Sequence, residues 1–147
     1  MKVTTIAIGC DHAGFPYKSV IIKMLSDQGI SVIDKGTYSG NSVDYPDFVH
    51  PVAEALEQNQ AELGILMCGS GNGVSMTANK HADIRAALCW NEEIAELARL
   101  HNDANIISIP VRFVSEEIAS AMVQKFITTA FEGGRHARRV GKIALSC

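Results

Sequence analysis

The glycine-rich segment that follows Cys68 is the part of the sequence best suited to chemistry. Gly69, Gly71 and Gly73 let the backbone come close to a ligand and turn amide N–H groups toward it. If a helix begins after Gly73, its N-terminus adds positive potential that favours an oxyanion or a phosphate. A cysteine beside such a loop is a candidate base. The alternative is a glycine turn next to a buried structural cysteine, and the local sequence leaves both interpretations open.

The same segment does not match the common nucleotide-binding fingerprints. The dinucleotide pattern GxGxxG requires a third glycine at one of two positions, which Val74 and Met76 occupy. The phosphate-binding pattern GxxxxGK[ST] is also missing from the chain. We therefore expect no nucleotide cofactor.

A second reactive group, Cys10-Asp11-His12, follows the first run of β-forming residues. Its position at the end of a predicted strand favours a functional role. A buried thiol and an aspartate that caps the next helix explain the same residues equally well. The turn alone does not decide between these alternatives.

His101 ends the apolar stripe of a predicted helix, because it follows Ile94, Leu97 and Ala98 with helical spacing. On periodicity it is a core histidine with a satisfied hydrogen bond, and this interpretation is slightly favoured. The alternative is an imidazole near the strand ends, followed by Asn102. There it could exchange protons near neutral pH.

Positive charge gathers near the C-terminus, where Arg135 and Arg139 are one helical turn apart. Two guanidinium groups on one face suit a phosphate. Arg112, after the last predicted strand, is a third candidate. A solvated basic helix end explains the pair equally well.

The elements that would position these residues alternate along the chain. Strands are predicted at residues 3–8, where Gly9 ends the strand, and at 30–33, 63–68, 85–89 and 105–109. The intervening helices carry apolar stripes, which are Val20, Ile21, Met24 and Leu25 before Gly29, and Val49, Val52, Ala53 and Leu56 after Pro46. Later helices are predicted after Asn91, after Ser115 and from about Glu132.

This alternation predicts a single α/β domain over residues 1–147. The sheet is parallel and doubly wound, with helices on both faces. In such sheets ligands bind beyond the carboxyl ends of the strands. The residues that follow strands are therefore the first candidates for a site.

The overall composition narrows the class of protein. Hydrophobic residues make up 47% and charged residues 20% of 147, which is typical of a globular protein. A net charge of -3 gives no reason to expect a nucleic acid or an anionic membrane as a partner. No run approaches the roughly 18 apolar residues of a membrane span, and the N-terminus lacks the pattern of a signal peptide. We therefore expect a cytoplasmic protein.

The four cysteines, Cys10, Cys68, Cys89 and Cys147, form no CxxC pair. In a cytoplasmic protein they would be reduced thiols. No grouping of histidine, cysteine, aspartate and glutamate has the sequence spacing of metal ligands. We therefore expect neither a metal nor another cofactor.

Taken together, the motifs resemble those of the ribose-5-phosphate isomerase B and galactose-6-phosphate isomerase family. The resemblance covers nearly the whole chain. Its anchors, in order, are the segments 9–14 (GCDHAG), 34–37 (DKGT), 44–46 (DYP), 68–73 (CGSGNG), 78–80 (ANK), 101–105 (HNDAN) and 132–136 (EGGRH). So many anchors in the right order make a chance similarity implausible.

The resemblance implies a Rossmann-like five-stranded parallel sheet and an aldose–ketose isomerase that converts ribose 5-phosphate to ribulose 5-phosphate through an enediol, without a metal. Cys68 would move the proton between C2 and C1. His101 would open the sugar ring with help from Asp11 and Ser70. The backbone amides of 69–73 would hold the enediolate oxygen.

The implied substrate- and phosphate-binding residues are Asp11, His12, Tyr45, Gly69, Ser70, Gly71, Asn72, Gly73, Asn102, Arg112, Arg135 and Arg139. Asn102 would bind sugar hydroxyls and Tyr45 would wall the pocket, while His12 and the three arginines would hold the phosphate. One branch of the family uses a glutamate base where this chain has Val74, so the chain fits the cysteine branch. The family's active site lies between subunits, which implies a homodimer or tetramer.

Two other interpretations remain. The first keeps the reaction class but changes the sugar to allose 6-phosphate or galactose 6-phosphate. The second is a non-catalytic module that binds a sugar phosphate, for which the arginines and the glycine loop would suffice. The presence of both Cys68 and His101 favours an enzyme.

Overall fold

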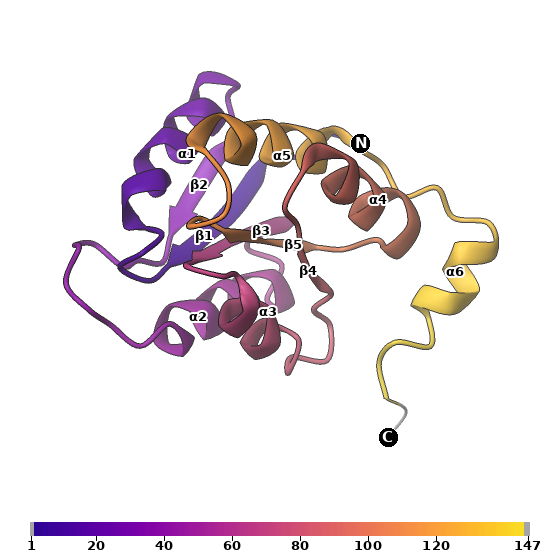
Figure 1. Ribbon diagram of the computed structural model, residues 1–147. Helices are drawn as coiled ribbons and strands as arrows, with labels where there is room; N and C mark the ends of the chain where they lie inside the picture. Colours follow the sequence, from indigo (N-terminus) through magenta and orange to yellow (C-terminus); the bar gives the residue numbers. More distant parts are fainter. Residues whose placement is uncertain (1, 146–147) are drawn as a thin grey trace.

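A five-stranded parallel sheet is the middle layer of the structure, a computed structural model that describes residues 2–145 (Figure 1). Its strands are β1 (Thr5–Cys10), β2 (Ser31–Asp34), β3 (Leu63–Cys68), β4 (Ala86–Leu88) and β5 (Ile106–Pro110). They lie in the order β2-β1-β3-β5-β4, and each neighbouring pair is parallel. The predicted doubly wound α/β class is therefore confirmed.

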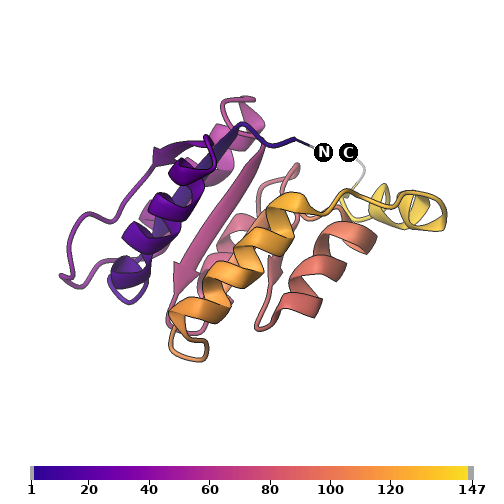
Figure 2. The same cartoon turned by 90° about the horizontal axis from the view of Figure 1, so that it is seen from above.

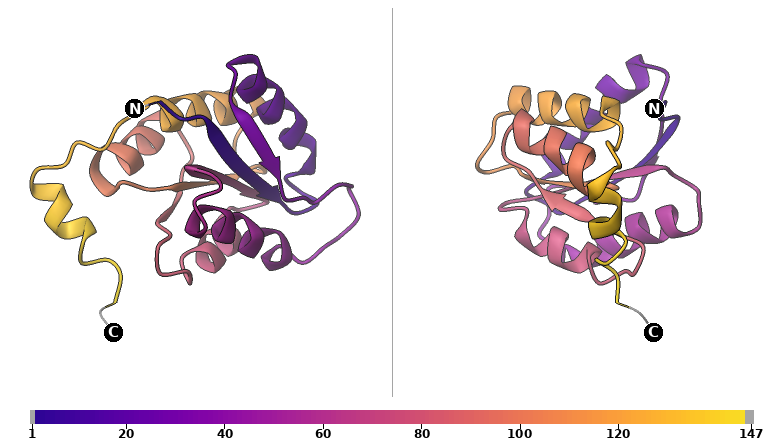
Figure 3. Two further views of the ribbon diagram at one scale, coloured as in Figure 1. Left: turned by 180° about the vertical axis from the view of Figure 1, so that it is seen from behind. Right: turned by 90° about the vertical axis from the view of Figure 1, so that its right-hand side faces the viewer.

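Helices cover both faces of this sheet. Three helices lie on one face (Figure 1), namely α1 (Phe15–Asp27), α4 (Glu92–Asn102) and α5 (Glu116–Thr128). The opposite face carries α2 (Pro46–Glu57) and α3 (Asn72–Ala78). The short helix α6 (Arg135–Val140) stands apart from these layers, beyond α4 (Figures 2 and 3). This outlying position matters below, because α6 carries two of the predicted phosphate ligands.

The side-chain alternation of β3 divides the core into two apolar clusters. Ile65 and Met67 point to the face covered by α1, α4 and α5. Leu66 and Cys68 point to the other face and share its buried cluster with Val74 of α3. The period of two therefore aims Cys68 toward α2 and α3, at the last position of its strand.

A proline in the first turn of one helix and capping side chains in two others place these helices where the sequence predicts them. α2 begins at Pro46. The side-chain oxygen of Asn91 accepts a hydrogen bond from the N–H of Ile94, at 2.9 Å, and Ser115 caps α5 through Ile118 in the same way, at 3.1 Å. These polar side chains satisfy backbone donors that the first turn of a helix otherwise leaves unpaired.

Two local predictions were wrong. β1 does not end at Gly9 but continues through Cys10, which pairs with Met67 of β3. In α1 the exposed Val20 is not part of the buried stripe, and Lys18 takes a buried position instead. The Lys18 ammonium group pairs with Asp34 at 2.9 Å, and this ion pair makes the burial of a charge tolerable.

Candidate active site

The loops after β1, β3 and β5 converge at the carboxyl end of β3. The N–H of Asp11 donates to the carbonyl of Met67, at 3.2 Å, and the N–H of Arg112 donates to the carbonyl of Gly69, at 3.1 Å. The segment after Cys68 is thus bound to both neighbouring strand ends. The structure brings together Asp11, Cys68 and Arg112, as the strand-end rule predicts.

Cys68 is buried, with 5% of its surface exposed. The backbone N–H of Gly71 donates a hydrogen bond to its Sγ at 3.2 Å. This turn requires a left-handed backbone at Gly71, where φ is 76°, and glycine adopts that conformation without steric cost. The sulfur therefore faces a backbone donor in the glycine loop.

The other two cysteines that the structure describes have a different character. Burial is the main cause that raises the pKa of Cys10 to about 11 and that of Cys89 to about 12. Both are therefore protonated thiols at neutral pH. Cys147 lies outside the described residues.

Two predicted binding residues press directly against the glycine loop. A Cβ at Gly69 would lie 3.1 Å from a guanidinium nitrogen of Arg112, and a Cβ at Gly73 would lie 2.3 Å from the ring of Tyr45. A side chain at Gly73 would overlap the Tyr45 ring, and one at Gly69 would press against the end of the Arg112 side chain. Tyr45 and Arg112 consequently flank the loop that follows Cys68.

The hydroxyl of Ser70 lies on the exposed side of this loop. Its Oγ accepts from the backbone N–H of Asn72 at 3.3 Å and from the Asn72 side-chain amide at 3.2 Å. α3 begins at Asn72, two residues before the start that was considered, after Gly73. Val74 is fully buried in the core. The assignment to the cysteine branch remains a prediction.

Asp11 and His12 hold the turn after β1. One carboxylate oxygen of Asp11 accepts from the N–H groups of Ala13, at 2.9 Å, and Gly14, at 3.2 Å. His12 Nδ1 accepts from the N–H of Val43 at 3.3 Å. Asp11 therefore stabilises the turn but does not cap α1, whose N-cap is Gly14 without a side-chain hydrogen bond. Its catalytic role remains a prediction.

His101 and Asn102 lie at the opposite edge of the sheet. α4 runs antiparallel to the strands, so its last turn reaches the amino edge, where the N–H of Asn105 donates to the carbonyl of Arg85 at 3.0 Å. β5 has five residues at about 3.3 Å each, so the two edges are separated by more than about 13 Å. Within one chain the prediction that His101 lies near the strand ends with Cys68 is therefore wrong.

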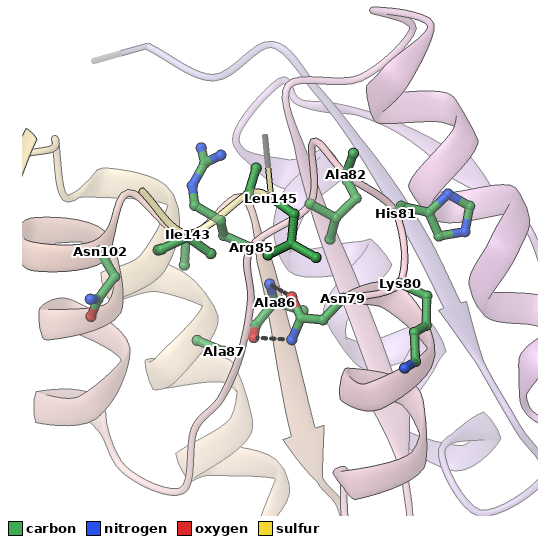
Figure 4. Close-up of a pocket in the computed structure, with 13 residues that line it drawn as sticks. Asn79, Lys80, His81, Ala82, Arg85, Ala86, Ala87, Asn102, Ile143 and Leu145 are labelled. Carbon is green, nitrogen blue, oxygen red and sulfur yellow. Dashed lines mark hydrogen bonds between the residues drawn. The ribbon is translucent and has the colours of Figure 1, made fainter. Parts of the chain in front are cut away.

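A cavity of about 530 Å³ lies at this amino edge (Figure 4). Asn102 and Arg85 line it together with Ile143 and Leu145 from the C-terminal segment. Ile143 is 54% exposed and Leu145 is 92% exposed. The cavity is thus rimmed by apolar side chains that the chain itself leaves uncovered.

His101 is not a core histidine, because 37% of its side chain is exposed. Its ring stacks on that of His136, with the centroids 4.3 Å apart, and its Nε2 lies 3.6 Å from Oε2 of Glu132. Sequence reasoning missed both neighbours. Helical spacing could not have found them, because Glu132 precedes α6, which begins at Arg135.

The environment of His136 disfavours its protonation. Burial is the main cause that lowers its pKa, and the nearby charges of His101, Arg135 and Arg139 act in the same direction. The negative charge of Glu132 acts in the opposite direction and raises this pKa. His136 is therefore held in the neutral form.

Arg135 and Arg139 are exposed at the two ends of α6. This helix begins at Arg135, whereas the predicted start was at about Glu132. The two arginines therefore lie on the same side of the molecule as His101 and Asn102. The predicted site consists of two halves, one at each edge of the sheet.

The expectation that the chain has no group of metal ligands also needs correction. The described residues include one such group, His101, Glu132 and His136, whose ligand atoms lie within 4.8 Å of one another. Their separation in the sequence concealed the group.

None of the helices in residues 2–145 combines the length and apolar character needed to cross a membrane.

Comparison with known proteins gives a consistent result. A family model described as Ribose/Galactose Isomerase matches residues 6–143. Ribose-5-phosphate isomerase B of Escherichia coli is 44% identical over 138 residues, which cover 94% of this chain and 93% of that protein.

Solved structures agree with the sequence comparison. A ribose 5-phosphate isomerase from Thermotoga maritima superimposes with a TM-score of 0.93 at 48% identity, covering 96% of this chain and 97% of that chain. Ribose-5-phosphate isomerase B from Mycoplasma genitalium, solved with bound ribulose-5-phosphate, gives a TM-score of 0.92 at 41% identity, covering 97% of this chain and 95% of that chain.

Proposed function

The chain belongs to the ribose/galactose isomerase family, and from this premise we propose that it interconverts ribose 5-phosphate and ribulose 5-phosphate. The observation that carries the proposal is the convergence of three loops on Cys68, in a chain 44% identical to a ribose-5-phosphate isomerase B. The reaction moves one proton between adjacent carbons. It needs a base, a donor for the developing oxyanion, and a means of opening the sugar ring.

Cys68 is the proposed base. Its thiolate takes the C2 proton of the open-chain aldose, which leaves an enediolate, and the resulting thiol returns the proton to C1, while the hydroxyl proton on O2 moves to O1. The amide N–H groups of residues 69–73 are the proposed donors to the enediolate oxygen. One such donor can be worth about 10²–10³ in rate. The hydrogen bond from Gly71 to Sγ at 3.2 Å supports this role, because a thiolate needs donors around it.

His101 is the proposed acid and base for ring opening, with Asp11 and Ser70 assisting. An imidazole suits this step because it can donate and accept a proton near neutral pH. Its position at the amino edge separates it from Cys68 of the same chain. The His101 that serves a given Cys68 is therefore supplied by a second copy.

A twofold dimer would complete the site. In a symmetric pair, the amino-edge half of one subunit can meet the carboxyl-edge half of the other, and the second site forms by the same operation. The uncovered apolar residues Ile143 and Leu145, beside the cavity at the amino edge, support a contact at that place. We propose a homodimer, or a tetramer built from it, with two shared sites per dimer.

The phosphate would be held from both subunits. His12 and Arg112 belong to the carboxyl-edge half, and Arg135 and Arg139 to the amino-edge half. Guanidinium groups bind phosphate through paired N–H donors. A phosphate at the junction would thus link substrate binding to the assembly of the dimer, while Asn102 binds sugar hydroxyls and Tyr45 closes one wall.

We further propose that the protein works in the cytoplasm. Cys10, Cys68 and Cys89 are free cysteines. A base that must remain a thiol is best preserved in a reducing compartment.

A direct assay of the purified protein tests the proposed reaction. Ribose 5-phosphate, allose 6-phosphate and galactose 6-phosphate are compared at equal concentration, with and without exhaustive chelation. We expect the highest kcat/KM for ribose 5-phosphate and no loss of activity after chelation. A clear preference for a six-carbon sugar would change the substrate but keep the reaction class. Binding without turnover of any sugar would instead indicate a non-catalytic module.

A further inference from the structure

His101, Glu132 and His136 form a compact group of side chains beside α6. His101 comes from the last turn of α4, and the other two come from the segment that leads into and begins α6. Oε2 of Glu132 lies 3.6 Å from Nε2 of His101 and 3.9 Å from Nε2 of His136. Two imidazole nitrogens and one carboxylate oxygen therefore lie close together, within 4.8 Å of one another.

His136 gives the second indication of a ligand. Only 9% of its side chain is exposed, and its Nε2 is fully buried with no hydrogen-bond partner among the described residues. Oε2 of Glu132, at 3.9 Å, is too distant for a hydrogen bond. A buried polar atom without a partner costs free energy, and this nitrogen lies within 4.8 Å of the two other potential ligand atoms.

We propose that these three residues bind a divalent transition metal, with Zn²⁺ as the best match. Zn²⁺ binds imidazole nitrogen and carboxylate oxygen at about 2.0–2.2 Å, and a tetrahedral arrangement then separates the ligand atoms by about 3.3 Å. Metal binding would bring these atoms closer than the 3.6 Å and 3.9 Å that separate them here. The two rings, stacked and inclined by only 15°, would also have to turn relative to each other, because an imidazole binds a metal in its own ring plane. Mg²⁺ and Ca²⁺ prefer oxygen ligands and would bind poorly.

The local charge limits the affinity of this site. Glu132 supplies the one negative charge, and Arg135 and Arg139 act on the same imidazole with the opposite sign. We therefore expect binding that is weaker than in a structural zinc site.

The consequence for activity rests on the proposed function. A metal that occupies Nε2 of His101 removes the imidazole from proton transfer, so ring opening stops while the base at Cys68 is untouched. The enzyme needs no metal, but Zn²⁺ inhibits it. Inhibition should affect a cyclic sugar phosphate more strongly than one that has no ring.

The site is tested first by binding alone. Co²⁺, which gives visible absorption when tetrahedral, and Zn²⁺, followed by calorimetry, are titrated into the chelator-stripped full-length protein. We expect one ion per chain in the wild type and at least a tenfold weaker affinity in His136→Gln and in Glu132→Gln. Glu132 is half exposed, so its variant preserves the test if the buried His136 variant does not fold.

His50→Gln is the matched control. His50 and His81 also form a close pair, with Nδ1 and Nε2 2.7 Å apart, but these nitrogens already bond to each other. This variant should bind both metals as the wild type does. No binding to the wild type, or binding to both cluster variants as tight as to the wild type, would overturn the proposal.

The second test measures inhibition of enzyme activity by Zn²⁺. Zn²⁺ should inhibit turnover of ribose 5-phosphate by the wild type, EDTA should restore it, and the half-inhibiting concentration should rise at least tenfold in Glu132→Gln. Metal binding without inhibition would overturn the inhibitory role, although the site itself would stand. Failure of the metal-free wild type to turn over ribose 5-phosphate would be a failure of the proposed function and not of the metal site.

Discussion

The backbone N–H of Gly71 donates to Sγ of Cys68 at 3.2 Å, which joins the proposed base to the loop proposed to hold the enediolate. The same loop is flanked by Arg112 at Gly69 and by Tyr45 at Gly73. One short segment thus links the base, the oxyanion donors and two substrate contacts. Changes in this segment should therefore affect catalysis more than stability.

Alkylation with iodoacetamide should distinguish the thiols at neutral pH. A thiol whose pKa is raised to about 11, as for Cys10, is ionised in only about one molecule in ten thousand at neutral pH, and Cys89 in still fewer. We expect activity to fall in proportion to modification of Cys68, as measured by peptide mass spectrometry. Bound substrate should slow the modification of Cys68. Rapid labelling of Cys10 or Cys89 in the folded protein would contradict this account.

Arg135→Ala and Arg139→Ala should each raise KM for ribose 5-phosphate by about tenfold or more, because a charge-assisted hydrogen bond is worth roughly 1.5–3 kcal/mol. A smaller loss of kcat is expected, since binding energy from the phosphate also aligns the reacting carbons. Arg138→Ala removes the same charge from the same helix and is the control. If all three variants behave alike, α6 acts only through its general charge.

Two inactive variants should regain activity when they form mixed dimers, if the active site is shared between subunits. Cys68→Ala supplies an intact His101, and His101→Asn supplies an intact Cys68. In random mixed dimers about half the molecules are heterodimers with one complete site of two, so activity should reach about a quarter of the wild type. The mixture is made by co-expression and compared with each variant alone. Activity no higher than that of the single variants would indicate that each chain completes its own site.

Gly9→Ala should destabilise the fold. A Cβ at this position would lie 2.3 Å from the carbonyl oxygen of Phe48, a backbone atom that cannot rotate away. Overpacking of this kind typically costs about 1–3 kcal/mol, measured by denaturant unfolding. At Gly40 a Cβ would have no atom within 4 Å, so Gly40→Ala should change stability by less than about 0.5 kcal/mol. Equal stability of both variants would contradict the close packing of β1 against α2.

Features that depend on local sequence were predictable. Pro46, Asn91 and Ser115 mark helix starts through fixed dihedral angles or side-chain caps, and neighbouring residues alone determine these effects. The apolar run of β3 identified a strand that is buried along its whole length. Its last residue, Cys68, could therefore be placed at the carboxyl edge before the structure was known.

Features that depend on distant contacts were not predictable. β1 continues past Gly9 because Cys10 pairs with Met67, which lies far along the chain. Lys18 is buried because Asp34 pairs with it.

The position of His101 shows the same limit. Helical periodicity gives the face of a helix but not the edge of the sheet where the helix ends. The neighbours of His101, Glu132 and His136, come from a segment about thirty residues later, which local patterns do not bring to it.

The most direct test of the central claim measures solvent deuterium entering C2 of the sugar by NMR. Ribose 5-phosphate is a closed furanose for most of the time, whereas erythrose 4-phosphate cannot close such a ring. Cys68→Ala should bind ribose 5-phosphate but lose C2 exchange on both sugars. His101→Asn should be strongly slowed on ribose 5-phosphate and should retain more exchange on erythrose 4-phosphate, if the latter is accepted by the wild type. Exchange at the wild-type rate in Cys68→Ala would remove Cys68 from the role of base, and equal losses on both sugars in His101→Asn would remove His101 from ring opening.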